Sequence, residues 1–209
     1  MDKITQKKNE KYLNIIASAF ELFEAKGMQA VSIDDIVKKA GIAKGTFYLY
    51  FTDKFDLVTK LIIKKAIEYM KKNPALSYFS DEADFREFIS PSIDFIIGFL
   101  LENKTLTMLI DKNVHICVNA VIEHREGLLE ELYEKICLHF INKGFSEEEF
   151  RIKFYLFSEL IVSACCNAII REYPYTLDEI KPHLFDIISK SLYNIEEKGR
   201  NSDDLCLRN

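Results

Sequence analysis

Apolar residues recur every three or four positions along most of the chain, which is the period of an amphipathic α-helix. Near the start, one such apolar face consists of Leu13, Ile16, Phe20 and Phe23. Gly27 is well placed to end this first helix. A sustained alternation of apolar and polar residues, which would predict strands, is not found. The sequence therefore predicts an all-α protein.

Three further helices are predicted in the N-terminal third. Ser32 is a suitable N-cap for a short second helix, with Asp35 three residues later to complete a capping box. Gly41 is expected to end that helix with a positive φ. A third helix is predicted over about 44–51, and a longer fourth helix over about 53–72.

The segment Asn-Pro-Ala-Leu-Ser at 73–77 is the best candidate for a boundary inside the chain. Beyond it, the apolar period predicts helices over 81–102, 104–117, 119–142, 146–171 and 177–197. Pro91 is expected to kink or split the first of these. We therefore expect one domain over 1–53, a second over 54–197, and a disordered tail over 198–209.

The predicted helices 146–171 and 177–197 carry apolar side chains on more than one face. Such a helix needs cover on all sides. A second copy of the protein would provide this cover in a four-helix bundle, which favours a homodimer. The alternative is that the first of these helices is simply buried inside a monomer.

The charge distribution is uneven. The net charge is −5, yet the first 60 residues carry ten lysines against eight acidic residues. A mildly basic start on an acidic remainder is typical of a small DNA-reading module joined to a body that does not contact phosphate. The most apolar stretch, 160–170, is too short to span a bilayer, and no secretory signal precedes it. We expect a cytoplasmic protein with no membrane association.

Chemistry of other kinds is not expected. The four histidines are too scattered for a metal site, and no phosphate loop, nucleophile elbow or acid–base pair is found. We therefore expect no metal, no cofactor and no enzymatic activity. The five cysteines form no Cys-x-x-Cys pair and are expected to be reduced. The adjacent Cys165 and Cys166 are either a redox switch or ordinary core thiols, and we favour the second.

The segment 32–54 carries the functional signal. Two short helices joined by a tight glycine turn form a helix-turn-helix, whose second helix enters the major groove of DNA. Gly45 removes a side chain where this helix must approach the sugar-phosphate backbone. Lys44, Thr46 and Tyr48 are placed to reach base edges and phosphates. A core-forming helix hairpin is the alternative, but it does not explain Lys44 and Gly45 at the helix start.

The run Ala-Gly-Ile-Ala-Lys-Gly-Thr-Phe-Tyr-x-Tyr-Phe-x-x-Lys at 40–54 resembles the signature of the TetR/AcrR family of bacterial transcriptional regulators. The resemblance covers about residues 10–60. It implies a three-helix DNA-binding head, a fourth helix leading to an effector-binding body, and dimerisation through the last two long helices. Carried over by position, the DNA-contacting residues would be Ser32, Lys44, Gly45, Thr46, Tyr48, Tyr50 and Lys54. Tyr50 stands where many members have histidine, and both side chains can reach a phosphate.

An effector site is expected in the body. A largely apolar cavity with a few polar groups is the usual form of a small-molecule site, although a solid core is the alternative. The candidate residues are Asp94, Phe95, Phe99, Met108, Asp111, His115, Phe157 and Glu159. The embedded carboxylates favour a lipophilic, cationic effector over an anionic one.

Three functions remain open at this point. The first, which we favour, is a dimeric repressor on an inverted-repeat, double-stranded operator that is released by a small lipophilic ligand. The second is a regulator of the same fold that activates transcription or ignores small molecules. The third is a helical ligand-binding or scaffold protein with an incidental helix-turn-helix.

Overall fold

The computed structural model describes residues 3–73 and 85–206, and every regular element within them is a helix. The predicted all-α class is confirmed. The chain divides into two compact units, Met1–Lys65 and Ala66–Asn209, which we call the head and the body. This division falls inside the fourth helix, which is long, whereas the sequence predicted a domain boundary before that helix, at 53/54.

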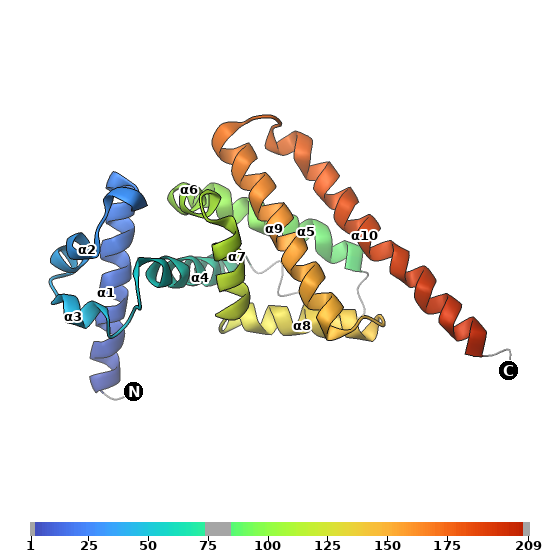
Figure 1. Cartoon of the computed structure of the whole chain (residues 1–209), viewed down its shortest axis with the longest axis horizontal. Helices are drawn as coiled ribbons and strands as arrows, with labels where there is room; N and C mark the ends of the chain where they lie inside the picture. Colours follow the sequence, from blue (N-terminus) through green and yellow to red (C-terminus); the bar gives the residue numbers. More distant parts are fainter. Residues whose placement is uncertain (1–2, 74–84, 207–209) are drawn as a thin grey trace. The chain divides into compact units, whose positions relative to one another are not determined.

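Four helices and the first part of a fifth make up the head. They are α1 (Lys3–Lys26), the 3-10 helix η1 (Met28–Ala30), α2 (Ile33–Ala40), α3 (Lys44–Phe47) and the start of α4 (Lys54–Lys72). Within the head, α2 packs against α1, and α3 packs against α2 (Figure 1). Its fully buried side chains include Ile15, Ile16, Phe23, Ile36, Phe47, Phe51, Leu57 and Leu61.

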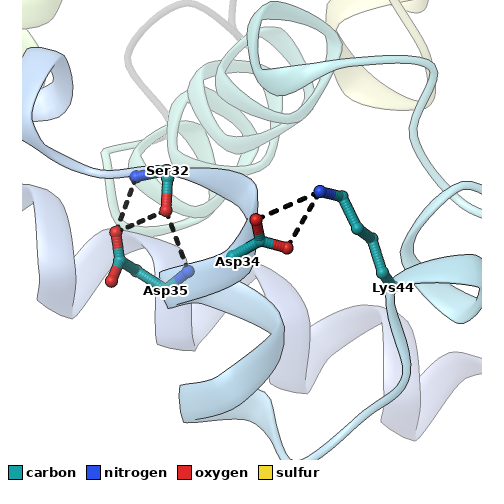
Figure 2. Close-up of polar contacts among 4 residues, drawn as sticks. All are labelled: Ser32, Asp34, Asp35 and Lys44. Carbon is teal, nitrogen blue, oxygen red and sulfur yellow. Dashed lines mark hydrogen bonds and ion pairs between the residues drawn. The ribbon is translucent and has the colours of Figure 1, made fainter.

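The local signals around α2 are confirmed. The Ser32 hydroxyl accepts a hydrogen bond from the Asp35 amide at 3.1 Å, and Asp35 Oδ2 accepts one from the Ser32 amide at 2.9 Å (Figure 2). The Ser32 hydroxyl also donates a hydrogen bond to Asp35 Oδ2 at 2.6 Å, and this bond, followed by the one from the Ser32 amide, lowers the pKa of Asp35. Gly41 follows α2 with a φ of 67°, a backbone conformation that favours glycine.

The third helix is shorter than predicted, because α3 ends at Phe47 rather than at residue 51. Residues 48–50 continue as turns. The Phe51 amide still donates to the Phe47 carbonyl at 3.1 Å, so the chain keeps a helical course up to the loop before α4.

The first turns of α4 are anchored in the head. The Lys54 ammonium donates to the carbonyl oxygens of Met28, at 3.0 Å, and Val31, at 2.9 Å. Lys60 donates to the Tyr50 carbonyl at 3.0 Å. These cation–carbonyl bonds join α4 to the segments before α2 and after α3, which accounts for its place in the head.

In the described part of the body, six helices follow: α5 (Phe85–Glu102), α6 (Lys104–Asp111), α7 (Val114–Glu123), α8 (Leu128–Asn142), α9 (Glu147–Arg171) and α10 (Leu177–Cys206). Helix α9 packs against α5, α6, α7, α8 and α10. Figure 1 shows α9 and α10 as the two long helices at the C-terminal end of the body. By length and composition α9 would suffice to cross a membrane, and within the body it contacts five other helices.

Three boundaries in the body differ from the prediction. The helices expected over 104–117 and 119–142 are wrong, because α6 ends at Asp111, α7 lies between, and α8 begins only at Leu128. Gly127 breaks the helix before α8 with a φ of 55° and a ψ of −126°, a conformation open mainly to glycine.

Neither of the two prolines inside the long helices interrupts its helix. Pro91 lies inside α5, which continues to Glu102 without the split that the sequence allowed for. Pro182 lies near the start of α10, and no further proline follows it. Helix α10 then extends to Cys206, into the segment 198–209 that was expected to be disordered. Residues 207–209 lie outside the described part of the chain, as does most of the boundary segment predicted at 73–77.

Candidate nucleic-acid interface and ligand cavity

Aromatic packing fixes the orientation of α3. The rings of Phe47 and Phe51 are buried with their centroids 5.4 Å apart, and Phe51 stacks on Tyr12 at the same distance. Because these rings face the core, the residues between them face outward. Tyr48 is 51% exposed and Leu49 is 78% exposed. The sequence did not single out Leu49, although an apolar residue outside the core period was the available signal.

Gly45 lies on the exposed side of α3. A Cβ atom added there would meet no other atom within 4 Å, so packing inside the head does not require glycine at this position. A bare backbone on an open surface instead permits close approach by another molecule. This agrees with the reason for which the sequence placed Gly45 in the interface.

Lys44 forms an ion pair at the start of α3. Its ammonium lies 2.9 Å from Asp34 Oδ1 and 3.1 Å from Oδ2, with both side chains more than half exposed (Figure 2). The hydrogen bond to Asp34 is the largest cause of the raised pKa of Lys44. The ammonium is therefore charged at neutral pH and open to solvent, but it already has a carboxylate beside it.

The other predicted contacts are placed differently. Ser32 is exposed, and its hydroxyl belongs to the capping box of α2. Thr46 is half-buried. Lys54 points its ammonium into the head, towards two backbone carbonyls, rather than outward. The structure thus brings Lys44, Gly45 and Tyr48 together on one outer face and gives Ser32 and Lys54 internal partners.

Tyr50 borders a surface cavity of about 380 Å³ together with Thr5, Lys8, Asn9 and Tyr12. The four residues from α1 are spaced i, i+3, i+4 and i+7, so they share one helix face. All five side chains carry a hydroxyl, an amide or an ammonium. We call this set the α1–Tyr50 groove. The sequence analysis missed it, although polar residues at this spacing were a readable signal.

A second cavity, of about 180 Å³, lies within the body between α5, α8, α9 and α10. Four rings contribute to its wall: Phe95, Phe140, Phe154 and Phe157. The rest of the wall is mainly isoleucine and leucine, with two serines, Ser92 and Ser158. Of the eight candidate effector residues, Phe95 and Phe157 line this cavity.

The two candidate aspartates are engaged in ion pairs instead. Asp94 pairs with Lys181. Both carboxylate oxygens of Asp111 accept hydrogen bonds from Arg171 at 2.7 Å. The hydrogen bond from Arg171 is the largest cause of the lowered pKa of Asp111. Partners from distant helices explain why the sequence could not assign these two carboxylates.

The remaining four candidates also lie outside the cavity wall. Met108 and His115 are exposed. Phe99 is buried against the Tyr69 ring, with centroids 5.8 Å apart. Glu159 is half-buried, and its Oε1 atom is enclosed without a hydrogen-bond partner.

Tyr69, near the end of α4, packs directly behind the cavity wall. Its ring meets Phe95 edge-on at 5.0 Å, and burial is the largest cause of its raised pKa. A Cβ on Gly98 would collide with the Tyr69 hydroxyl, so α5 needs glycine there to admit the ring. No pattern in the sequence marks this contact, because the predicted boundary separates the two segments.

Burial raises the pKa of both Cys165 and Cys166 to about 12. Their thiols are therefore protonated at neutral pH, which disfavours the nucleophilic chemistry that a redox switch requires. The arrangement favours the interpretation of these cysteines as core residues.

Comparison with known proteins shows that the head is similar to one family. Residues 15–61 match the sequence profile of the family described as bacterial regulatory proteins, tetR family. An uncharacterized HTH-type transcriptional regulator of Bacillus subtilis is 54% identical over 48 residues, which are 23% of this chain and 25% of that protein. An HTH-type transcriptional regulator of Staphylococcus aureus is 32% identical over 118 residues, 56% of this chain and 60% of that protein.

The fold extends the likeness beyond the head. The crystal structure of a TetR-family transcriptional regulator from Streptomyces coelicolor matches with a TM-score of 0.61 at 15% identity, over 88% of this chain and 99% of that one. The sequence matches to the two curated relatives span only a quarter and 60% of their lengths. The helix-turn-helix signature and these matches show that the head is similar to the tetR family of bacterial regulatory proteins, and the all-helical body shares the fold of the solved structure.

Proposed function

We propose that the protein is a cytoplasmic transcriptional regulator that binds an inverted-repeat operator as a homodimer and leaves it when a small ligand occupies the body. The observation that carries the DNA-binding part is the outer face of α3, where Lys44, Gly45 and Tyr48 are exposed while Phe47 is fully buried. A surface that combines a cation, bare backbone and an aromatic hydroxyl suits a groove of DNA.

In this proposal Tyr48 and Leu49 face the bases. Tyr48 would donate or accept a hydrogen bond at a base edge, and Leu49 would contact a thymine methyl group. Lys44 would exchange Asp34 for a phosphate. The α1–Tyr50 groove would hold a neighbouring phosphate, with Lys8 supplying the charge.

The dimer would use the last two helices. Exposed apolar side chains remain on α9, at Ile152 and Leu156, and on α10, at Phe185 and Ile187. Apolar surface of this kind on adjacent helices marks an interaction site. A second copy related by a two-fold axis would cover it and would set two reading helices on two operator half-sites.

Ligand release is supported by the apolar cavity in the body and by the contact between Tyr69 of α4 and Phe95 of its wall. A ligand that moves Phe95 would act on the end of α4, the helix whose start is anchored in the head. A ligand-independent or activating regulator of the same fold is the alternative.

An electrophoretic mobility shift with the DNA that flanks the protein's own gene tests the proposal. We expect a retarded protein–DNA complex that persists in an excess of non-specific competitor DNA. This complex should contain two protein chains per site. If no specific complex forms at low salt, the proposed function is wrong. Transcription measured in vitro from the same DNA then separates repression from activation.

A further inference from the structure

The chemistry of the body cavity defines the class of molecule that it takes. Among the described residues that line it, none is charged, and the polar side chains are Ser92 and Ser158. Moving an unpaired charge from water into such surroundings costs far more than burying a neutral group. The part of a ligand that this cavity encloses must therefore be uncharged.

The nearby charges do not change this result. Asp94, Asp111 and Glu159 are the carboxylates that favoured a cationic effector on sequence grounds. Asp94 and Asp111 each already lie beside a cation, Lys181 or Arg171, and none of the three carboxylates lines the cavity. The cavity wall itself therefore offers no charge to attract a cationic ligand.

The cavity volume limits the size of the ligand. At about 180 Å³ it is close to cavities of about 150 Å³, lined by leucine, isoleucine and phenylalanine, that stay dry and bind benzene. One ring with small substituents, or a two-ring compound such as indole, matches this space. A long acyl chain exceeds it.

The aromatic wall is held in place before a ligand arrives. Phe140 and Phe154 both contact the buried ring of Phe150, with centroids 5.0 and 5.5 Å apart. Phe154 also meets Tyr133 edge-on at 5.0 Å. Fixed rings offer both faces and edges to a guest, which favours an aromatic ligand.

We propose that the cavity between α5, α8, α9 and α10 binds a small, neutral aromatic molecule of one or two rings, and that it rejects charged molecules of the same size. This inference rests on the proposed function for its consequence at the operator. The binding step itself is independent of DNA and can be measured without it.

The test uses the full-length protein and four probes: toluene, indole, benzylammonium and benzoate. Isothermal titration calorimetry and ligand-observed NMR should detect toluene and indole, with binding at least tenfold tighter than that of benzylammonium or benzoate. Equal or tighter binding of either charged probe would overturn the assignment of a neutral ligand. Failure of both neutral probes to bind would overturn the site itself.

A variant locates the binding. Ser158→Leu adds apolar volume inside the cavity and should weaken toluene binding at least tenfold, with circular dichroism unchanged. Ser163→Leu is the matched control, because it makes the same change on the exposed side of the same helix and should bind toluene like the parent. If Ser158→Leu is unfolded, Ile161→Val provides the second variant. This substitution removes one methyl group from the cavity wall and so enlarges the cavity. It should leave toluene binding unchanged and strengthen the binding of naphthalene.

DNA experiments then separate the two proposals. If toluene or indole binds but leaves the operator complex intact, the cavity assignment stands and ligand release is wrong. If the protein binds no operator at all, the proposed function is wrong, whereas the calorimetric result for the cavity is unaffected.

Discussion

The Lys44 ammonium lies 2.9 Å from an oxygen of the Asp34 carboxylate, so the cation at the start of α3 has an internal anionic partner. A phosphate must compete with this carboxylate. We expect Asp34→Asn to bind DNA of any sequence several-fold more tightly and to increase the salt slope by about one. Glu21→Gln is the control, since Glu21 forms a comparable exposed pair with Lys39 elsewhere in the head. Fluorescence anisotropy at several salt concentrations measures both, and an unchanged affinity for Asp34→Asn contradicts the competition.

Tyr48 is the residue that we expect to discriminate between sequences. Tyr48→Ala should weaken operator binding by about 1–3 kcal/mol and leave non-specific binding nearly unchanged. Its ring is half exposed, so the head should keep its thermal stability. Competition binding with operator and scrambled duplexes measures the ratio. A variant that keeps the parent's ratio would show that α3 does not read the operator.

Lys54 should contribute to stability more than to phosphate binding. Its two bonds to backbone carbonyls are charge-assisted, and such bonds each contribute about 1.5–3 kcal/mol. We expect Lys54→Met to lower the midpoint of thermal unfolding clearly, while Lys38→Met, on an exposed site of α2, should not. If Lys54→Met unfolds like the parent and yet loses DNA affinity, the phosphate contact that the sequence implied is correct after all.

The dimer should depend on exposed rather than buried apolar residues of α9 and α10. Leu156 and Ile187 are 54% and 51% exposed, and an aspartate at either position should give folded monomers in sedimentation experiments. Leu138→Asp on α8 is the control, because it places the same charge on an equally exposed leucine outside these helices. Monomeric behaviour of the parent at micromolar concentration would contradict the proposal.

The pair Asp111–Arg171 predicts a pH dependence of stability. The Asp111 side chain is 13% exposed, and the hydrogen bond from Arg171 lowers its pKa below the unfolded value. The pair therefore stabilises the fold above the usual aspartate pKa, and this contribution is lost as the pH falls through that pKa towards the lower folded value. The midpoint of thermal unfolding of Asp111→Asn should therefore change less with pH over this acidic range than that of the parent. Asp186→Asn, from an exposed pair with Lys190, should keep the parent's profile.

Sequence was sufficient where the determining chemistry is local. The capping box of Ser32 and the positive φ of Gly41 depend on residues within one turn, and both were predicted correctly. The end of α3 was missed because Phe51 remains apolar and buried whether or not the helix continues. Gly127 was missed because nothing in the periodicity marks a glycine that adopts a positive φ.

Sequence was insufficient where distant segments decide. Ile161 and Leu156 both belong to a helix that is apolar nearly all round, yet Ile161 lines the cavity and Leu156 faces solvent. The same holds for Ile188 and Ile187 on α10. No periodic pattern can separate an inner from an outer face when both are apolar. Which face is buried therefore depends on the helices that pack against it.

The anchoring of α4 by Lys54 has a consequence for how regulators of this kind can be recombined. A head excised at residue 53 would leave the carbonyls of Met28 and Val31 without their donor and would remove Leu57 from the core. A functional chimera must therefore be spliced within α4, after Lys65, so that the transplanted head brings its own anchor. In such a chimera the part of α4 up to Lys65 is transplanted with the head, and the part that carries Tyr69 stays with the body.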